Sequence, residues 1–265
     1  MELPLYQVDA FSDKVFGGNP AAVCPLDDWL PDKTLCNIAA ENNLSETAFF
    51  IPSQEDGIDY DLRWFMPAGE VDLCGHATLA TAFVVFEKLD FKKNIVNFSS
   101  RSGTLSVSKT KTGLLMDFPI WAIEETSPRE DVTAALGAEP KIFYEGKYWL
   151  VEFEQEEDVR SLSPDFKSLK AIQDVDFLIA TAPANDSDTD FVSRFFCPQH
   201  GVDEDPVTGS AHCVLTPFWA ERLNKTTLKA RQISARGGNL LCALKGERVE
   251  INGQAVLYME GKIHV

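Results

Sequence analysis

Short stretches of alternating hydrophobic and polar residues dominate the first 120 residues, and glycine, proline and asparagine separate them. In the first stretch, residues 5–11, every second side chain faces one side, as expected of a half-buried strand. A turn over residues 17–20 and a second strand over residues 21–25 follow, and residues 31–43 are expected to form a helix. Further strands are predicted at residues 46–51, 59–65, 95–99, 103–107 and 114–118.

One segment of this half departs from the alternation. Residues 75–89 carry alanine, threonine, leucine, valine and phenylalanine on nearly every side of a helix, which is typical of a helix buried all round. Neither this segment nor any other approaches the 18 or so consecutive apolar residues that cross a bilayer. No membrane-spanning helix is therefore expected.

The second half repeats this plan. A proline-rich, acidic crossing over residues 119–140, with a short helix at 129–136, marks the predicted boundary between two lobes. A second apolar helix is expected over residues 208–223, distorted at Pro217 because proline lacks the helical N–H. The acidic run 152–158 is expected to be solvated. Strands are predicted at residues 142–144, 148–153, 177–182, 191–196, 228–234, 239–244, 248–251 and 254–263, and another helix at 164–172.

The two buried helices share one pattern. Residues 74–89 align without gaps on residues 208–223, with identical Gly, Ala, Glu and Leu at 75/209, 77/211, 87/221 and 89/223. Because the order of strands around each helix also matches, a duplicated lobe is favoured over chance. The predicted fold is α+β, with two pseudo-symmetric lobes at residues 1–120 and 121–265 and the active site in the cleft between them. Each lobe is a curved sheet wrapped around one helix, and the terminal strand can cross between lobes.

Composition narrows the choice of partners. Of the 265 residues, 45% are hydrophobic and 25% charged, which suits a globular protein with a sizeable core. A formal net charge of −17 repels nucleic acid and anionic membranes, so neither is expected as a partner. A small anionic metabolite can still bind if backbone donors and local dipoles hold it. No secretory signal opens the chain, and six scattered cysteines fit free thiols, so a cytoplasmic location is expected.

Both helix starts offer a place for a ligand. Helix N-termini expose unpaired N–H groups with positive partial charge, and Gly75 and Gly209 let the backbone approach a ligand closely. For a single helix the plainer interpretation is capping by Thr208, Ser210 or Asp205. Two equivalent starts in duplicated lobes favour a substrate-binding site instead.

Four sequence blocks resemble the signature blocks of the PhzF family, the phenazine-biosynthesis isomerase-like proteins. They are GNPAAV at residues 18–23, NLSETAF at 43–49, CGHAT at 74–78 and EDPVTGSAH at 204–212, in the family's order along essentially the whole chain. The resemblance implies the diaminopimelate epimerase fold, with a mixed β-barrel around a central helix in each lobe. It also implies a cofactor-independent isomerase that acts on a small anionic metabolite and can form a homodimer.

The resemblance also implies the site. Glu46 is expected to be the acid/base carboxylate, with His76 and Asp205 as catalytic auxiliaries, because a carboxylate can carry a proton and an imidazole can relay or orient it. The plainer interpretations are an exposed strand residue for Glu46 and helix caps for His76 and Asp205. Substrate binding is expected from Asn19, Cys74, Gly75, Thr208, Gly209 and Ser210.

One departure separates this chain from the related epimerases and racemases of the same fold, which place a cysteine ahead of each helix glycine. Here Cys74 holds one position and Thr208 the other, and a threonine hydroxyl is too weak an acid to replace a thiol. Racemisation by two thiols is therefore not expected, and the reaction that the resemblance implies is a proton shift through Glu46. Two alternatives stay open: a non-catalytic small-acid-binding protein, and an epimerase or racemase that depends on a Cys74 thiolate. Since no nucleotide or zinc motif is present, no cofactor or metal is expected.

Overall fold

The structure is a computed structural model that describes residues 1–67 and 69–265. By its packing the chain divides into two units, one formed by Met1–Asp117 with Asn252–Val265 and the other by Phe118–Ile251. The C-terminal segment therefore belongs to the first unit and not to a second lobe that runs to residue 265. It does so because its strand pairs along almost the whole of the first strand of the chain. Within the described ranges, no helix is both long enough and apolar enough to cross a membrane.

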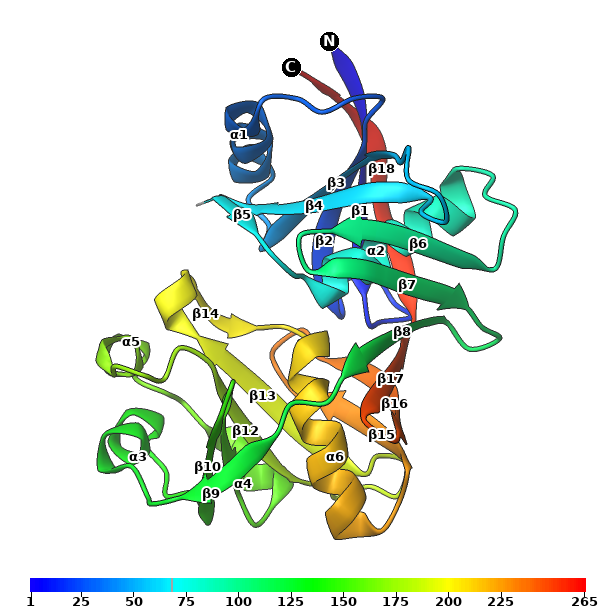
Figure 1. The fold of residues 1–265 in the computed structure, drawn as a ribbon. Helices are drawn as coiled ribbons and strands as arrows, with labels where there is room; N and C mark the ends of the chain where they lie inside the picture. The colour runs from blue at the N-terminus through cyan, green and yellow to red at the C-terminus, as the bar shows by residue number, and fades with distance from the viewer. Residues whose placement is uncertain (68) are drawn as a thin grey trace. The chain divides into compact units, whose positions relative to one another are not determined.

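The first unit is a mixed sheet around one helix (Figure 1). The first strand, β1, pairs antiparallel with β18 on one side and β2 on the other. From β2 the order continues through β3, β4, β6 and β7 to β8, and the short β5 pairs with β4. The strands are β1 (Glu2–Ala10), β2 (Asn19–Pro25), β3 (Glu46–Pro52), β4 (Tyr60–Met66), β5 (Gly69–Val71), β6 (Ile95–Ser100), β7 (Gly103–Lys109), β8 (Leu114–Pro119) and β18 (Ala255–His264).

Two strand pairs of this unit are parallel, β2 with β3 and β4 with β6. Parallel neighbours need a crossover, and helices α1 (Asp32–Asn42) and α2 (Gly75–Lys88) supply the two crossovers. Ten of the fourteen residues of α2 are buried, and the helix packs on β1, β2, β3, β7 and β18. The prediction of a helix buried all round is confirmed, with its polar end at Glu87 and Lys88.

The second unit is built on the same plan. Its strands β11 and β12, and β13 and β15, form the parallel pairs, and the remaining pairs are antiparallel. Helix α6 (His212–Leu223) crosses between β13 and β15 and packs on β15 and β16. The strands are β9 (Ile123–Thr126), β10 (Ile142–Gly146), β11 (Trp149–Glu152), β12 (Leu178–Pro183), β13 (Phe191–Cys197), β14 (Val202–Asp205), β15 (Thr227–Gln232), β16 (Gly238–Lys245) and β17 (Arg248–Gly253), and the other helices are α3 (Glu130–Leu136), α4 (Glu156–Ser161), α5 (Phe166–Ala171) and the short 3-10 turns η1 (Pro198–His200) and η2 (Gly209–Ala211).

The strand pairings of the two units correspond one to one. Strands β10, β11, β12, β13, β14, β15 and β16 pair with one another as β1, β2, β3, β4, β5, β6 and β7 do. The ninth strand of each half is exchanged: β9 pairs with β10, and β18 pairs with β1. The duplication inferred from two helices therefore extends to the whole chain.

The acidic run at 152–158 is solvated only in part: Glu154 and Glu157 are exposed, as predicted, whereas two other carboxylates are not. Glu152 and Glu156 are buried, with 9% and 5% exposure. Glu152 ends β11 beside the Tyr144 hydroxyl and the Arg222 guanidinium, each 3.4 Å from its Oε2. Glu156 pairs with Arg160 and accepts the backbone N–H of Asn185 at 2.8 Å. Both carboxylates can be buried because each has charged or polar partners, which a run of acidic letters does not reveal.

The second buried helix also starts differently from its prediction at residue 208. Gly209–Ala211 form a 3-10 turn, and the α-helix begins at His212. The tight turn arises because the Thr208 carbonyl accepts the ring N–H at Nδ1 of His212, 2.9 Å away. The backbone N–H of His212 donates to the carbonyl oxygens of Gly209 and Ser210. Pro217 lies inside α6 as expected.

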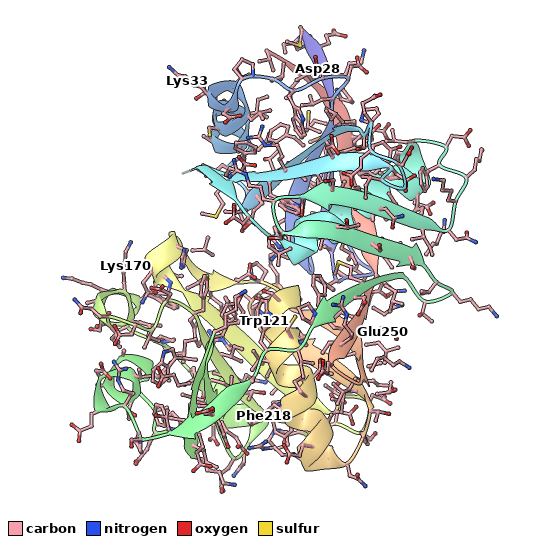
Figure 2. The ribbon with its side chains drawn as sticks, in the orientation of Figure 1. Asp28, Lys33, Trp121, Lys170, Phe218 and Glu250 are labelled. Atoms are coloured by element: carbon pink, nitrogen blue, oxygen red, sulfur yellow. The ribbon has the colours of Figure 1, made fainter. Side chains whose placement is uncertain are left out.

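The Cys213 carbonyl is the one that the missing Pro217 N–H leaves free. It accepts the backbone N–H of Trp121 at 3.0 Å, so the segment after β8 supplies the missing hydrogen-bond donor. Trp121 is labelled beside α6 in Figure 2, and its ring also packs edge-on against Tyr148. The proline thus ties this segment to the helix without an unpaired carbonyl at that position.

Gly18 illustrates how a family block can serve the fold. It has a φ of +66°, and a Cβ there would lie 2.1 Å from the Ala10 carbonyl oxygen. We expect Gly18→Ala to lower the free energy of unfolding by about 3 kcal/mol or more. Gly137 has a nearly equal φ of +69° with no atom within 4 Å of the added Cβ, so Gly137→Ala should cost only about 1 kcal/mol. Urea unfolding of both variants measures the difference, and equal losses would contradict the steric argument.

Candidate active site

The starts of β2, β3 and α2 meet at one end of the first unit's sheet. Strands β2 and β3 are parallel, so both begin at the same edge, with Ala21 opposite Glu46. Asn19 is the first residue of β2 and Glu46 the first of β3. Asn43 ends α1 with a left-handed φ of 51°, which turns the chain into β3. The parallel register therefore explains why blocks far apart in sequence supply neighbouring side chains.

Glu46 and His76 form the central contact of this group. Oε2 of Glu46 lies 3.2 Å from Nε2 of His76, and the two side chains are 15% and 6% exposed. The two atoms face each other without hydrogen-bond geometry, and neither has another hydrogen-bond partner within the described ranges. Glu46 is thus mostly shielded from solvent rather than exposed on a strand. A carboxylate and an imidazole in this arrangement can exchange a proton with each other or with a third group.

The other ring nitrogen of His76 is also engaged. Nδ1 lies 3.2 Å from Nδ2 of the fully buried Asn19 and 3.5 Å from Sγ of Cys74. With the Asn19 amide N–H donating to Nδ1, the ring carries its proton on Nε2, toward Glu46. A doubly protonated ring would instead need the amide oxygen at Nδ1, which a half-turn of the amide supplies. Asn19 therefore contacts His76 and sets which nitrogen holds the proton.

Burial and charge act in opposite directions on this group. Burial raises the pKa of the Cys74 thiol, and the Glu46 carboxylate adds to the rise. Burial alone would lower the pKa of His76, but negative charge on Cys74 and Glu46 and the hydrogen bond with Cys74 raise it well above its usual 6.5. Near neutral pH the Glu46 carboxylate contributes more than Cys74 to the raised pKa of His76, because the Cys74 thiol keeps its proton. A reactive Cys74 thiolate, one of the open alternatives, is therefore disfavoured.

The second unit holds its own polar group at the equivalent helix start. The Thr208 hydroxyl donates to Oδ2 of Asp205 at 2.5 Å, and the Thr208 N–H donates to the Gln232 amide oxygen at 2.9 Å. The fully buried Gln232 also donates to the Asp205 carbonyl at 2.7 Å. Neither Thr208 nor Cys74 caps its helix through a side-chain hydrogen bond. Capping therefore does not explain these residues.

Ser210 has a partner that was not predicted. The Tyr148 hydroxyl lies 3.0 Å from Oγ of Ser210. Burial raises the pKa of Tyr148 to about 12, so its phenol keeps the proton at physiological pH. The rings of Trp121, Phe177 and Phe195 surround that of Tyr148 and fix its position. A phenol O–H that donates to Ser210 would leave the serine O–H for an anionic ligand.

The structure gathers the predicted residues into two groups that belong to different units. Asn19, Glu46, Cys74 and His76, with Gly75 between the last two, lie in the first. Asp205, Thr208 and Ser210, with the buried Gly209, lie in the second. Tyr148 and Gln232 were not among the predicted site residues: Tyr148 precedes β11 with no motif around it, and Gln232 ends β15. The repeat could have drawn attention to Gln232, since β15 follows the second buried helix as β6 follows the first.

His212 gives the second unit a measurable dependence on pH. Burial lowers the pKa of this fully buried ring from its usual 6.5 to about 4. Between these values the unfolded chain binds a proton that the folded chain does not, so stability is complete above about pH 6.5 and falls as the pH drops toward 4. We expect this ring to account for a loss of about 3 kcal/mol across that window.

Urea unfolding of wild type and His212→Gln tests this expectation at about pH 7.5, above the window, and at about pH 4.5, near its lower end. Glutamine keeps a donor for the Thr208 carbonyl, so the variant should unfold with a visibly weaker pH dependence. His264→Gln, at the exposed end of β18, serves as the matched control and should retain the wild-type dependence. An unchanged pH dependence in His212→Gln would show that other groups govern it.

Comparisons with known proteins show which family the chain is similar to. The profile of the PhzC-PhzF family, described as phenazine biosynthesis-like proteins, matches residues 8–261. An uncharacterized isomerase of Pseudomonas aeruginosa is 51% identical over 100% of both chains. The crystal structure of a PhzF-family phenazine biosynthesis protein from Enterococcus faecalis superimposes with a TM-score of 0.95 at 46% identity, covering 100% of both chains.

A more distant likeness bears on the fold alone. A hydroxyproline epimerase from Agrobacterium vitis, solved with trans-4-hydroxy-L-proline bound, has a TM-score of 0.64 at 10% identity, over 99% of this chain and 92% of that one. Together with the mixed strands and few helices described above, these neighbours confirm the predicted α+β class and the resemblance read from the four sequence blocks.

Proposed function

Because this chain belongs to the PhzC-PhzF family of phenazine biosynthesis-like proteins, we propose that it moves a proton within a small carboxylate-bearing metabolite, with Glu46 as the acid/base and no cofactor. An isomerase-type function is supported by a curated relative named as an isomerase and by epimerases among the structural neighbours. The finer assignment to Glu46 depends on the geometry of the first unit's group.

The contact between Glu46 and His76 carries the proposal. As a carboxylate, Glu46 takes a proton from a carbon next to an electron-withdrawing group and then returns it to another carbon of the same molecule. The raised pKa of His76 favours an imidazolium opposite the Glu46 carboxylate, 3.2 Å away. Asn19 acts through His76 as a positioning residue, since it contacts Nδ1 and not Glu46.

The residues of the second unit have separate proposed roles. Asp205 is assigned as an auxiliary acid/base, and its Oδ2 already accepts the Thr208 hydroxyl. In the second unit we assign anion binding to the Ser210 hydroxyl and the backbone around Gly209, and the backbone around Gly75 is the equivalent candidate within the first unit. A protein with a net charge of −17 needs such local donors, because its overall field opposes an anion.

Exchange of solvent deuterium into candidate unsaturated or cyclic acids tests the role of Glu46. Wild type should introduce deuterium at the carbon that loses its proton, and Glu46→Gln should slow this exchange roughly a thousandfold, since the amide cannot accept the proton. Glu41→Gln, on the exposed end of α1, should exchange as fast as wild type. Equal rates in wild type and Glu46→Gln would remove Glu46 from the mechanism.

The same assay separates the two alternatives. A Cys74-dependent racemase predicts loss of exchange in Cys74→Ser, whereas proton transfer through Glu46 predicts that most of the exchange remains, because the protonated thiol is not the base. A non-catalytic acid-binding protein predicts thermal stabilisation by the acid with no deuterium uptake even by wild type.

The Tyr148–Ser210 contact yields a kinetic expectation. With the acid that exchanges, Ser210→Ala and Tyr148→Phe should each raise KM, by roughly tenfold for the serine and less for the tyrosine, because each removes one hydroxyl from the proposed anion site. The kcat should change little in either variant. In Tyr148→Phe the ring packing against Trp121 and Phe195 is kept, so a large fall in kcat with an unchanged KM would contradict a binding role.

A further inference from the structure

The first unit's group contains three different kinds of metal-binding atom. Glu46 offers a carboxylate oxygen, Cys74 a thiol sulfur and His76 an imidazole nitrogen, and one such atom from each lies within 4.8 Å of the other two. They come from the start of β3, the residue before α2 and the first turn of α2. Because rigid elements hold all three, they are placed together before any ligand arrives.

Two of these atoms lack a hydrogen-bond partner. Oε2 of Glu46 and Nε2 of His76 are buried and make no hydrogen bond within the described ranges, although they lie 3.2 Å apart. The His76 side chain is only 6% exposed, so water does not readily serve its ring nitrogen. Buried polar atoms in proteins are nearly always paired, and an exception needs an explanation.

The distances suit a small tetrahedral cation. With Zn–N and Zn–S bonds of about 2.0 and 2.3 Å, neighbouring ligand atoms lie about 3.3 to 3.6 Å apart. Cys74 Sγ lies 3.5 Å from His76 Nδ1, and Glu46 Oε2 lies 3.2 Å from His76 Nε2. Only one nitrogen of the His76 ring can bind the ion. The ligand on the other side of the ring, Glu46 or Cys74, therefore has to move inward by roughly 1 Å from the 4.8 Å limit. A rotation of the Glu46 or Cys74 side chain is enough for that.

We propose that Glu46, Cys74 and His76 form a binding site for a thiophilic divalent cation such as Zn²⁺ or Cd²⁺, with a fourth position left for water or an anion. On binding, the Cys74 S–H bond breaks and a sulfur–metal bond forms, and the ring nitrogen of His76 that binds the ion also gives up its proton; both protons pass to solvent with no change of oxidation state. Thiolate and imidazole ligands select such cations over Mg²⁺, which prefers oxygen. A net charge of −17 also draws cations toward the protein.

The consequence for activity rests on the proposed function. A metal bound to Glu46 and His76 occupies the lone pair that would take the substrate proton, so the cation should inhibit isomerisation. Binding of the cation does not depend on turnover, and the two ideas can therefore fail separately.

Titration of the full-length protein with Cd²⁺ in excess Mg²⁺ tests the site, since Mg²⁺ fills exposed carboxylate sites without binding thiolates. Wild type should take up one equivalent, release protons from Cys74 and His76 and gain the ultraviolet thiolate-to-cadmium absorption. Cys74→Ser should lose that absorption. Glu46→Gln and His76→Asn should keep it but bind by about tenfold to a hundredfold more weakly.

Cys36→Ser is the matched control, because Cys36 is a partly exposed thiol on α1, away from the three ligands in the sequence. It should bind Cd²⁺ as wild type does. The proposal is overturned if wild type shows no thiolate absorption, if the absorption persists in Cys74→Ser, or if Cys36→Ser removes it. Circular dichroism of each variant identifies one that has not folded, and Cys74→Ala then replaces Cys74→Ser.

The deuterium-exchange assay with and without Cd²⁺ completes the design. If exchange occurs and Cd²⁺ suppresses it reversibly, with a chelator restoring it, the cation shares residues with the reaction. If wild type binds Cd²⁺ through Cys74 but exchanges no acid, the metal site stands and the proposed isomerase function fails. If wild type exchanges acids but gains no thiolate absorption, the proposed isomerase function stands and the metal site fails.

Discussion

Parallel strand pairing is the constraint on which the site in the first unit depends. Two neighbouring strands that run in the same direction must begin at the same edge of the sheet, and the chain must cross over between them. The pair β2 and β3 therefore places Asn19 and Glu46 side by side, and the crossover α2 begins with Cys74-Gly75-His76 beside them. Burial of α2 on five strands then fixes the angle at which His76 meets Glu46.

The duplicated plan holds throughout the strand pairings and breaks at single side chains. Thr78 and His212 are equivalent, and each uses its side chain to bond the carbonyl four residues earlier, at Cys74 and Thr208. Threonine leaves the first turn of α2 regular, whereas histidine converts the start of α6 into a 3-10 turn. His76 corresponds to Ser210 in the alignment. The two equivalent positions thus carry different chemistry on similar backbones.

Opposing electrostatic effects give the first unit's group its character. Burial would keep both His76 and Cys74 neutral, but a carboxylate 3.2 Å from the ring changes the balance for histidine alone. The negative charge of Glu46 favours the imidazolium and disfavours the thiolate, so this one carboxylate gives the two groups different protonation states. Glu46 and His76 suit proton transfer, and together with Cys74 they also suit a thiophilic cation, because both tasks need buried lone pairs held close together.

Residue letters alone determined the α+β class, the buried helix at 75–89, the repeat and the family, since hydrophobic periodicity and local motifs record burial and turn chemistry directly. They named Glu46, His76 and Asp205 only through resemblance, because nothing local distinguishes Glu46 from an exposed strand residue. Only the tertiary structure decided the contacts between residues far apart in the sequence. It placed β18 with β1, buried Glu152 and Glu156 against their partners, set Asn19 on His76, and brought Tyr148 to Ser210 across 62 positions.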